Sequence, residues 1–140
     1  MHSAAYAALF FTVVMLVTTA YFIMGGLPLL ILKHDTPVDA RFIRGFFNLY
    51  YKAAIGAALG AAVSYALWGR PAFAAGAVAI AATVALLRRR FIPAMERLGA
   101  QIQASDESAI QQFRKIHSTA LLVNLAQLIL LVWSVTQIRL

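Results

Sequence analysis

Long apolar segments without charge alternate along the chain with shorter segments that carry almost all of its charged residues. Four segments lack Asp, Glu, Lys and Arg over roughly the length of a membrane crossing: residues 3–32, 53–69, 71–87 and 116–138. A helix needs about 20 residues, within a range of ~17–25, to cross a hydrocarbon core about 30 Å thick. Because open strands leave backbone groups unpaired in lipid, the four segments are predicted to be helices.

The predicted fold is all-α, an antiparallel four-helix transmembrane bundle that forms a single domain over residues 1–140. The helices are expected at about residues 4–32, 45–69, 71–103 and 106–138. The third helix is expected to kink near Pro93 and to continue as a cytoplasmic helical extension between helices three and four. Apolar residues recur along this extension at helical spacing: Ile92, Met95, Leu98 and Ile102. Such a stripe lies on the lipid surface or packs on the protein, and the sequence leaves both open.

Two places along the chain carry signals for a helix bend or a helix start. Gly25, Gly26 and Pro28 lie near the end of the first helix, where they predict a kink or an end near the membrane surface, with a functional hinge as the alternative. The first helix lacks a basic leader and is longer than a signal-peptide core, so it is interpreted as retained. Residues 105–108, Ser-Asp-Glu-Ser, supply capping side chains for the start of the fourth helix.

Composition supports a membrane protein and excludes several other classes. The chain of 140 residues is 62% hydrophobic and 12% charged, whereas soluble domains are roughly 45–50% apolar and about 25% charged. It contains no cysteine. Disulfide scaffolds, thiol chemistry, iron–sulfur clusters and cysteine-bound zinc are therefore excluded.

The basic residues are distributed asymmetrically about the predicted helices. The formal net charge is +7, from 12 Lys and Arg against 5 Asp and Glu. Ten basic residues lie in or beside the connections from helix one to two and from helix three to four: Lys33, Arg41, Arg44, Lys52, Arg88, Arg89, Arg90, Arg97, Arg114 and Lys115. Arg70 and Arg139 lie opposite. The positive-inside rule then predicts cytoplasmic connections and extracytoplasmic termini, in a bacterial inner membrane. Basic residues that flank apolar runs indicate a lipid bilayer as partner and no nucleic acid.

Small residues on the second helix form a predicted packing face. Gly56, Gly60 and Ser64 follow one another at four-residue spacing. Such faces let helix backbones approach closely. The sequence leaves two uses open, a contact inside the bundle or a contact with a second chain in a homo-oligomer or a larger membrane complex.

Polar side chains at membrane depth form the candidate site. His117, Asn124, Gln127 and Ser134 share one face of the fourth helix. Five residues are predicted to border a pocket in the cytoplasmic half, open to a lipid-soluble ligand: His117, Asn124, Asn48, Lys52 and Tyr51. The alternative is hydrogen bonding between helices, with Lys52 reaching the surface.

Cofactor and enzyme signals are sparse. No metal or cofactor is expected, but His34 and His117 are weak candidate ligands for a metal or haem b, and a quinone is a further alternative. The sequence contains no G-x-S-x-G, H-E-x-x-H or phosphate-binding loop. Catalytic residues are therefore unknown, and whether the chain is an enzyme stays open.

Short motifs spread over the chain resemble those of known families. The segment 113–118 followed by Asn124 resembles an uncharacterised family that includes a transmembrane protein associated with cisplatin resistance. The same segment, with Pro93 and with Gly25, Gly26 and Pro28, is similar to the anthrone-oxygenase-like family of small four-helix membrane proteins. That resemblance implies a site for an apolar aromatic substrate near His117. The chain departs from the pattern after Pro93, where Ala94 and Met95 follow instead of an asparagine.

A weaker likeness connects Pro28 and His34 with the small membrane protoporphyrinogen oxidases. The chain lacks the histidine in helix one and the histidine and lysine in helix three of those proteins, so their haem chemistry does not transfer. The function expected first is therefore a non-catalytic accessory subunit or self-associating bundle. The alternatives are an enzyme or binder that acts on an aromatic or quinone-like molecule, and a haem-binding redox protein.

Overall fold

The described residues, 2–104 and 106–139 with the backbone alone at Gln103, form four α-helices and no strand in this computed structural model. The helices are α1 (His2–Leu29), α2 (Pro37–Leu67), α3 (Pro71–Gln103) and α4 (Glu107–Thr136). All four are long and apolar enough to cross a membrane. The all-helical prediction is therefore confirmed, and length and composition indicate a membrane protein.

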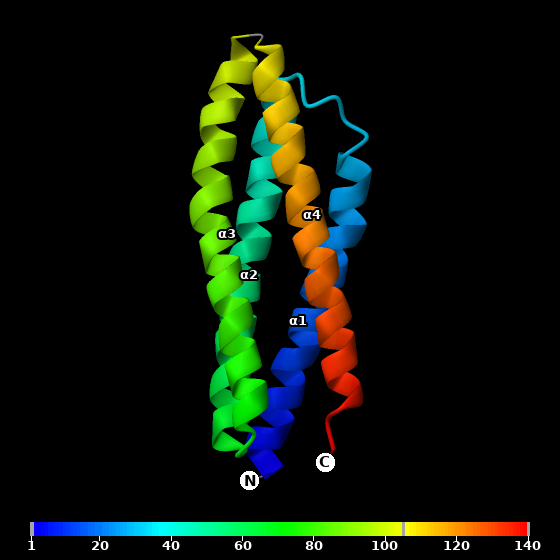
Figure 1. Cartoon of the computed structure of the whole chain (residues 1–140), viewed down its shortest axis with the longest axis vertical. Coiled ribbons are helices and arrows are strands. Elements are labelled where there is room, and N and C mark those ends of the chain that lie inside the picture. The colour runs from blue at the N-terminus through cyan, green and yellow to red at the C-terminus, as the bar shows by residue number, and fades with distance from the viewer. Residues whose placement is uncertain (1, 105, 140) are drawn as a thin grey trace.

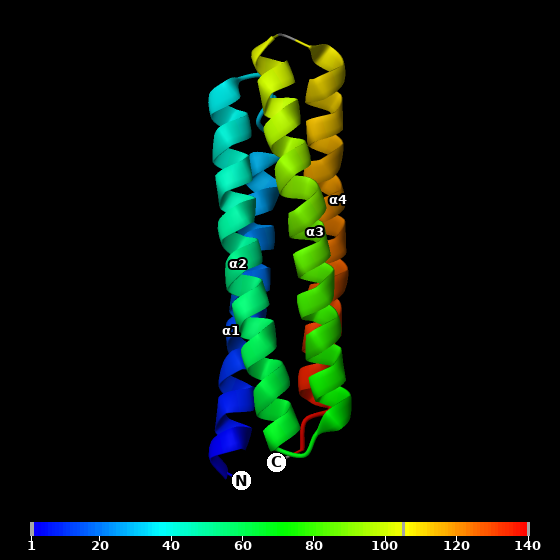
Figure 2. The same ribbon diagram turned by 90° about the vertical axis from the view of Figure 1, so that its left-hand side faces the viewer.

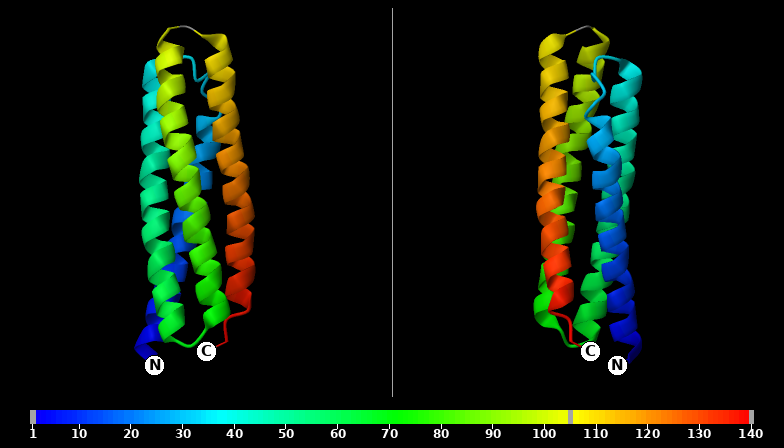
Figure 3. Two further views of the ribbon diagram at one scale, coloured as in Figure 1. Left: turned by 60° about the vertical axis from the view of Figure 1, so that its left-hand side comes forward. Right: turned by 90° about the vertical axis from the view of Figure 1, so that its right-hand side faces the viewer.

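The helices follow one another around an elongated bundle (Figures 1 and 2). Helix α2 packs against α1 and α3, and α4 packs against the same two helices from the other side (Figure 3). The α1–α2 and α3–α4 connections lie at one end, which we call the loop end. The α2–α3 turn, the start of α1 and the end of α4 lie at the other, the terminal end.

Helix α2 begins at Pro37, two turns before the predicted start at residue 45. Thr36 caps it by accepting a hydrogen bond from the backbone N–H of Asp39 at 3.2 Å, and Pro37 suits the first helical position because it lacks an N–H. The prediction relied on freedom from charge and so overlooked this cap. Helix α1 ends at Leu29, before the predicted residue 32.

Helix α3 continues through Pro93 to Gln103. Met95, Leu98 and Ile102 are buried in the core, so the apolar stripe of this segment packs on the protein. Helix α4 starts at Glu107, and Asp106 caps it by accepting from the backbone N–H of Ser108 at 3.0 Å. Ser105, the first residue of the predicted capping segment, lies outside the described residues.

Glycines at two positions of α1 permit close helix approach. A Cβ added to Gly25 would lie 2.8 Å from the ring of Phe46, and one added to Gly26 would lie 2.6 Å from Leu121. These glycines, which the sequence associated with a bend or hinge, therefore let α1 contact both α2 and α4.

The three predicted packing residues of α2 divide between the inside and the outside of the bundle. Ser64 is buried, and a Cβ added to Gly60 would lie 2.5 Å from the ring of Phe11 on α1. Gly56 is exposed, and a Cβ there would have no neighbour within 4 Å among the residues described. Gly56 therefore offers a surface that no helix among the described residues covers.

The core changes character along the bundle axis. Large side chains fill the loop half, among them Phe22, Phe47, Tyr50, Tyr51 and Phe113. Alanines dominate the terminal half: Ala8, Ala57, Ala58, Ala61, Ala62, Ala77 and Ala81. Because alanine occupies little volume, the terminal half leaves space between helices that the loop half does not.

Candidate functional site

The polar face predicted on α4 points into the bundle. His117, Asn124 and Gln127 are buried, and Ser134 is half-buried. Burial of polar groups is costly unless they find partners, so buried polar side chains normally form hydrogen bonds within the protein.

The connection between α1 and α2 brings His34 to His117. His34 has a backbone φ of 60°, in the left-handed region, and its side chain is fully buried. Its Nε2 lies 3.0 Å from Nδ1 of His117, and Nε2 of His117 lies 2.9 Å from the carbonyl oxygen of Gly26. The three groups form one chain of hydrogen bonds that joins α1, the connection and α4.

The donor and acceptor roles of these groups fix which imidazole nitrogens of His34 and His117 carry protons. The Gly26 carbonyl only accepts, so Nε2 of neutral His117 donates and its Nδ1 accepts from Nε2 of His34. The lone pair on Nδ1 of His34 then faces no hydrogen-bond partner among the described residues. The Gly26 carbonyl is free for this role because the N–H of Leu30 turns to Leu27 instead.

Burial lowers the pKa of His34 below its ordinary value of 6.5, and the positive charge of Arg114 lowers it further. The Leu32 carbonyl and the carboxylates of Asp39 and Asp35 act in the opposite direction, with smaller effects. His34 is therefore mainly neutral at pH 7.

The two histidines are brought together, but their facing nitrogens are too close to be ligands on opposite sides of one metal ion or haem iron. An ion between two imidazole nitrogens needs about 2 Å to each, or about 4 Å in all when the nitrogens are opposed. The facing nitrogens are only 3.0 Å apart and are bonded to each other. Among residues 2–104 and 106–139, no group of three or more His, Cys, Asp or Glu side chains could hold a metal ion.

The other predicted pocket residues have separate surroundings. Tyr50 donates to Oδ1 of Asn124 at 2.6 Å, and Nδ2 of Asn124 donates to the Thr19 carbonyl at 3.4 Å. Asn48 accepts from Nε of Arg88 at 3.0 Å.

Lys52 and Tyr51, the last two of the five predicted pocket residues, differ in burial. Lys52 is exposed. Tyr51 is buried, with no partner for its hydroxyl in the described part of the chain. The structure therefore does not gather the five predicted residues around one space.

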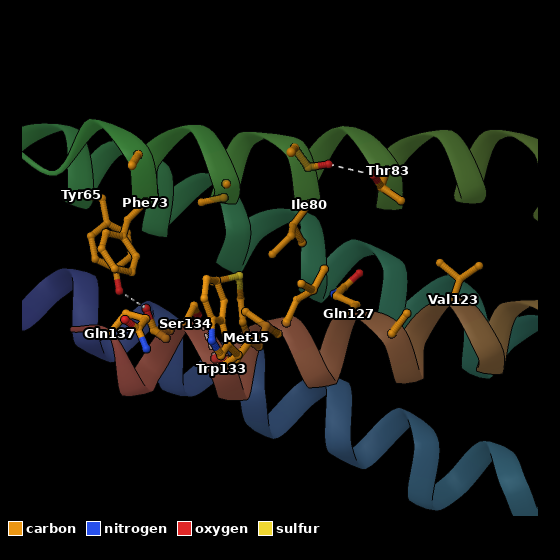
Figure 4. A pocket seen from close by; sticks show the side chains of 18 residues that line it. Met15, Tyr65, Phe73, Ile80, Thr83, Val123, Gln127, Trp133, Ser134 and Gln137 are labelled. Carbon is orange, nitrogen blue, oxygen red and sulfur yellow. Dashed lines mark hydrogen bonds between the residues drawn. The ribbon is translucent and has the colours of Figure 1, made fainter.

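A cavity of about 610 Å³ lies instead in the terminal half, with its mouth between α3 and α4 (Figure 4). None of the five predicted pocket residues lines it. Its wall includes Met15, Phe73, Ile80, Leu131 and Trp133, with polar groups from Thr12, Tyr65, Thr83, Gln127, Ser134 and Gln137. The residues at its rim are exposed on the side of the bundle: Ala72, Gly76 and Ala79 from α3, and Ala126, Leu130 and Trp133 from α4.

Sequence reasoning identified Gln127 and Ser134 as inward-facing but assigned them to no cavity. It missed Tyr65, Phe73 and Trp133. The available signal was the high content of small residues along 71–83, mostly alanine with Gly76, which here leaves space between helices.

No family model, curated protein or solved structure matches this chain. The function is therefore inferred from the geometry of the cavity and of the hydrogen bonds between buried polar groups.

Proposed function

We propose that this protein binds an apolar, ring-bearing molecule dissolved in the bilayer, of aromatic or quinone-like chemistry, in the cavity between α3 and α4. The observation that carries the proposal is the cavity of about 610 Å³ itself. Small-molecule sites occupy roughly 300–1,000 Å³, with mostly apolar walls and a few convergent polar groups. Aromatic side chains at Tyr65, Phe73 and Trp133 offer faces and edges on which a flat ring can pack.

The membrane arrangement follows from charge and length. The ten basic residues named above lie between the middle of the bundle and the loop end, so we place that end in the cytoplasm of a bacterial cell, with the termini outside and the helices antiparallel across the inner membrane. Helix α3 has 33 residues and is about 50 Å long at 1.5 Å per residue. It exceeds the hydrocarbon core, so its final turns extend into the cytoplasm. The cavity then lies in the extracytoplasmic half and opens laterally toward lipid.

Orientation can be tested because the chain has no cysteine of its own. Single cysteines at Ser108, in the first turn of α4, and Ser3, in the first turn of α1, lie at opposite ends. In intact cells a membrane-impermeant maleimide is expected to label Ser3→Cys but to reach Ser108→Cys only after permeabilisation. The opposite labelling pattern would reverse the proposed orientation.

Ligand binding can be followed through Trp133, which lines the cavity. The other tryptophan, Trp68, is replaced by phenylalanine so that Trp133 is the only one left. Duroquinone is expected to quench the fluorescence of this variant with a saturable binding curve, because quinones quench indoles on contact.

Two glycines supply a matched pair for this experiment. A Cβ at Gly76 or at Gly56 would meet nothing within 4 Å among described atoms, but only Gly76 lines the cavity. Gly76→Phe is expected to abolish the saturable quenching by filling the cavity, and Gly56→Phe to leave it intact. Equal quenching in both variants would show that duroquinone reaches Trp133 from lipid or detergent without entering the cavity.

The open surface at Gly56 favours a second candidate function, an accessory subunit or self-associating bundle. Its exposed backbone would let a helix of another chain approach closely. Light scattering on the same samples distinguishes this candidate, because an assembly formed there would be broken by Gly56→Phe and retained in Gly76→Phe.

A further inference from the structure

Four hydroxyl groups line the cavity, and all four use their protons within the protein. Thr12 donates to the Ala8 carbonyl, Thr83 to the Ala79 carbonyl and Ser134 to the Leu131 carbonyl, each at 2.8 Å. The fourth group, on Tyr65, lies 2.8 Å from the oxygen of Thr12 (Figure 4).

The bond between Thr12 and Tyr65 has a definite direction. A hydroxyl has one proton and two lone pairs. Because the proton of Thr12 is committed to Ala8, Tyr65 must be the donor in their contact. The four cavity oxygens are thus available to a ligand only as acceptors.

Three side chains in the cavity wall carry N–H donors: Gln127, Trp133 and Gln137. The amide of Gln127, which is 7% exposed, offers both N–H donors and a carbonyl acceptor. In Figure 4 it lies away from Tyr65, with Met15 and Ile80 between them. The N–H groups of Trp133 and Gln137 belong to exposed side chains.

We propose that the cavity selects rings that carry hydroxyl groups, such as a hydroquinone, over the same ring with carbonyl oxygens; this selection rests on the proposed binding function. A ligand hydroxyl can donate to the oxygen of Tyr65 or Ser134, whereas a quinone carbonyl would oppose its lone pairs to theirs. A second oxygen on the ring can bond to the amide of Gln127, which accepts from a ligand hydroxyl and donates to a ligand carbonyl, so this contact does not distinguish the two forms. Only binding is involved, and no bond of the ligand is made or broken.

The test compares durohydroquinone with duroquinone, which share one ring and four methyl groups, under anaerobic conditions. Dissociation constants are measured by equilibrium dialysis, because the two forms quench tryptophan to different extents. Durohydroquinone is expected to bind about fivefold to tenfold more tightly, the factor that one net hydrogen bond supplies. Equal affinities, or tighter binding of duroquinone, would overturn the selection.

A pair of serine variants assigns the preference to the cavity. Ser134→Ala removes one acceptor and is expected to reduce the ratio of the two dissociation constants by about threefold. Ser118→Ala removes an equivalent hydroxyl, bonded to the Arg114 carbonyl at 3.0 Å and outside the cavity lining, and is expected to preserve the ratio. A ratio unchanged by Ser134→Ala would count against the assignment.

Failure of the selection is distinguishable from failure of the binding function. If both forms bind equally and Gly76→Phe abolishes both, the cavity binds rings without selecting hydroxyls. If neither form binds, or Gly76→Phe leaves binding of both unchanged, the proposed binding function itself is wrong.

Discussion

Replacement of His117 by alanine is expected to lower the midpoint of thermal unfolding by about 10 °C. The change leaves the Gly26 carbonyl and Nε2 of His34 without the partner that each has in the folded protein. A buried polar group without a partner costs about 1–3 kcal/mol, and 1 kcal/mol corresponds to roughly 3–4 °C for a chain of this size. Circular dichroism at 222 nm in a mild detergent measures the midpoint.

Ser118→Ala, one residue further along α4, is the matched control. It removes a half-buried hydroxyl bonded within its own helix and leaves no buried group without a partner, so its midpoint is expected to stay within about 2 °C of the unmodified protein. A His117→Ala midpoint in that same narrow range would show that the buried hydrogen-bond chain contributes little to stability.

Burial of His34 gives the stability of the protein a pH dependence. The pKa of His34 in the folded protein lies below 6.5, the value of the unfolded chain. Between these two pKa values the unfolded chain binds more protons than the folded protein. The free energy of unfolding is therefore highest above pH 6.5, and the contribution of neutral His34 is lost as the pH falls from 6.5 through the folded pKa. His34→Asn is expected to flatten this part of the profile, because asparagine tolerates a positive φ and does not titrate.

Alanine substitutions at Gly56 and Gly60 are expected to change stability in opposite directions. Gly56 faces open space, so alanine there stabilises the helix by about 1 kcal/mol through its higher helix propensity. At Gly60 the new Cβ would lie 2.5 Å from one ring atom of Phe11 and 2.7 Å from two others. Overpacking of this kind costs about 1–3 kcal/mol.

The two variants control each other, since the substitution, the helix and the residue type replaced are the same. Thermal midpoints measured in one detergent are expected to rise for Gly56→Ala and to fall for Gly60→Ala. Equal shifts for both would mean that α1 and α2 do not approach each other at Gly60.

Helix content and the inward face of α4 were predictable because both are local properties. Charge-free length identified all four helices, and the spacing of His117, Asn124 and Gln127 placed them on one face that the structure buries. The start of α2 at Pro37 was also encoded locally, in the cap formed by Thr36, but a criterion based on charge alone did not detect it.

The partners of those side chains depended on tertiary structure. His34 and His117 are 83 residues apart, and their pairing required the α1–α2 connection to turn inward at a left-handed residue. Gly56 and Gly60 share one sequence pattern, yet only the position of Phe11 on α1 gives Gly60 a neighbour.

The location of empty space depended on the fold most of all. A cavity is the volume left over by side chains from several helices, and no single segment specifies it. Here four helices contribute to the wall of one cavity, in the half where alanines meet. The length of the charge-free segments determined that the chain forms apolar helices, and the spacing of polar residues gave α4 a polar inner face. The packing of the helices decided which polar groups bond to one another and which face a ligand-sized space.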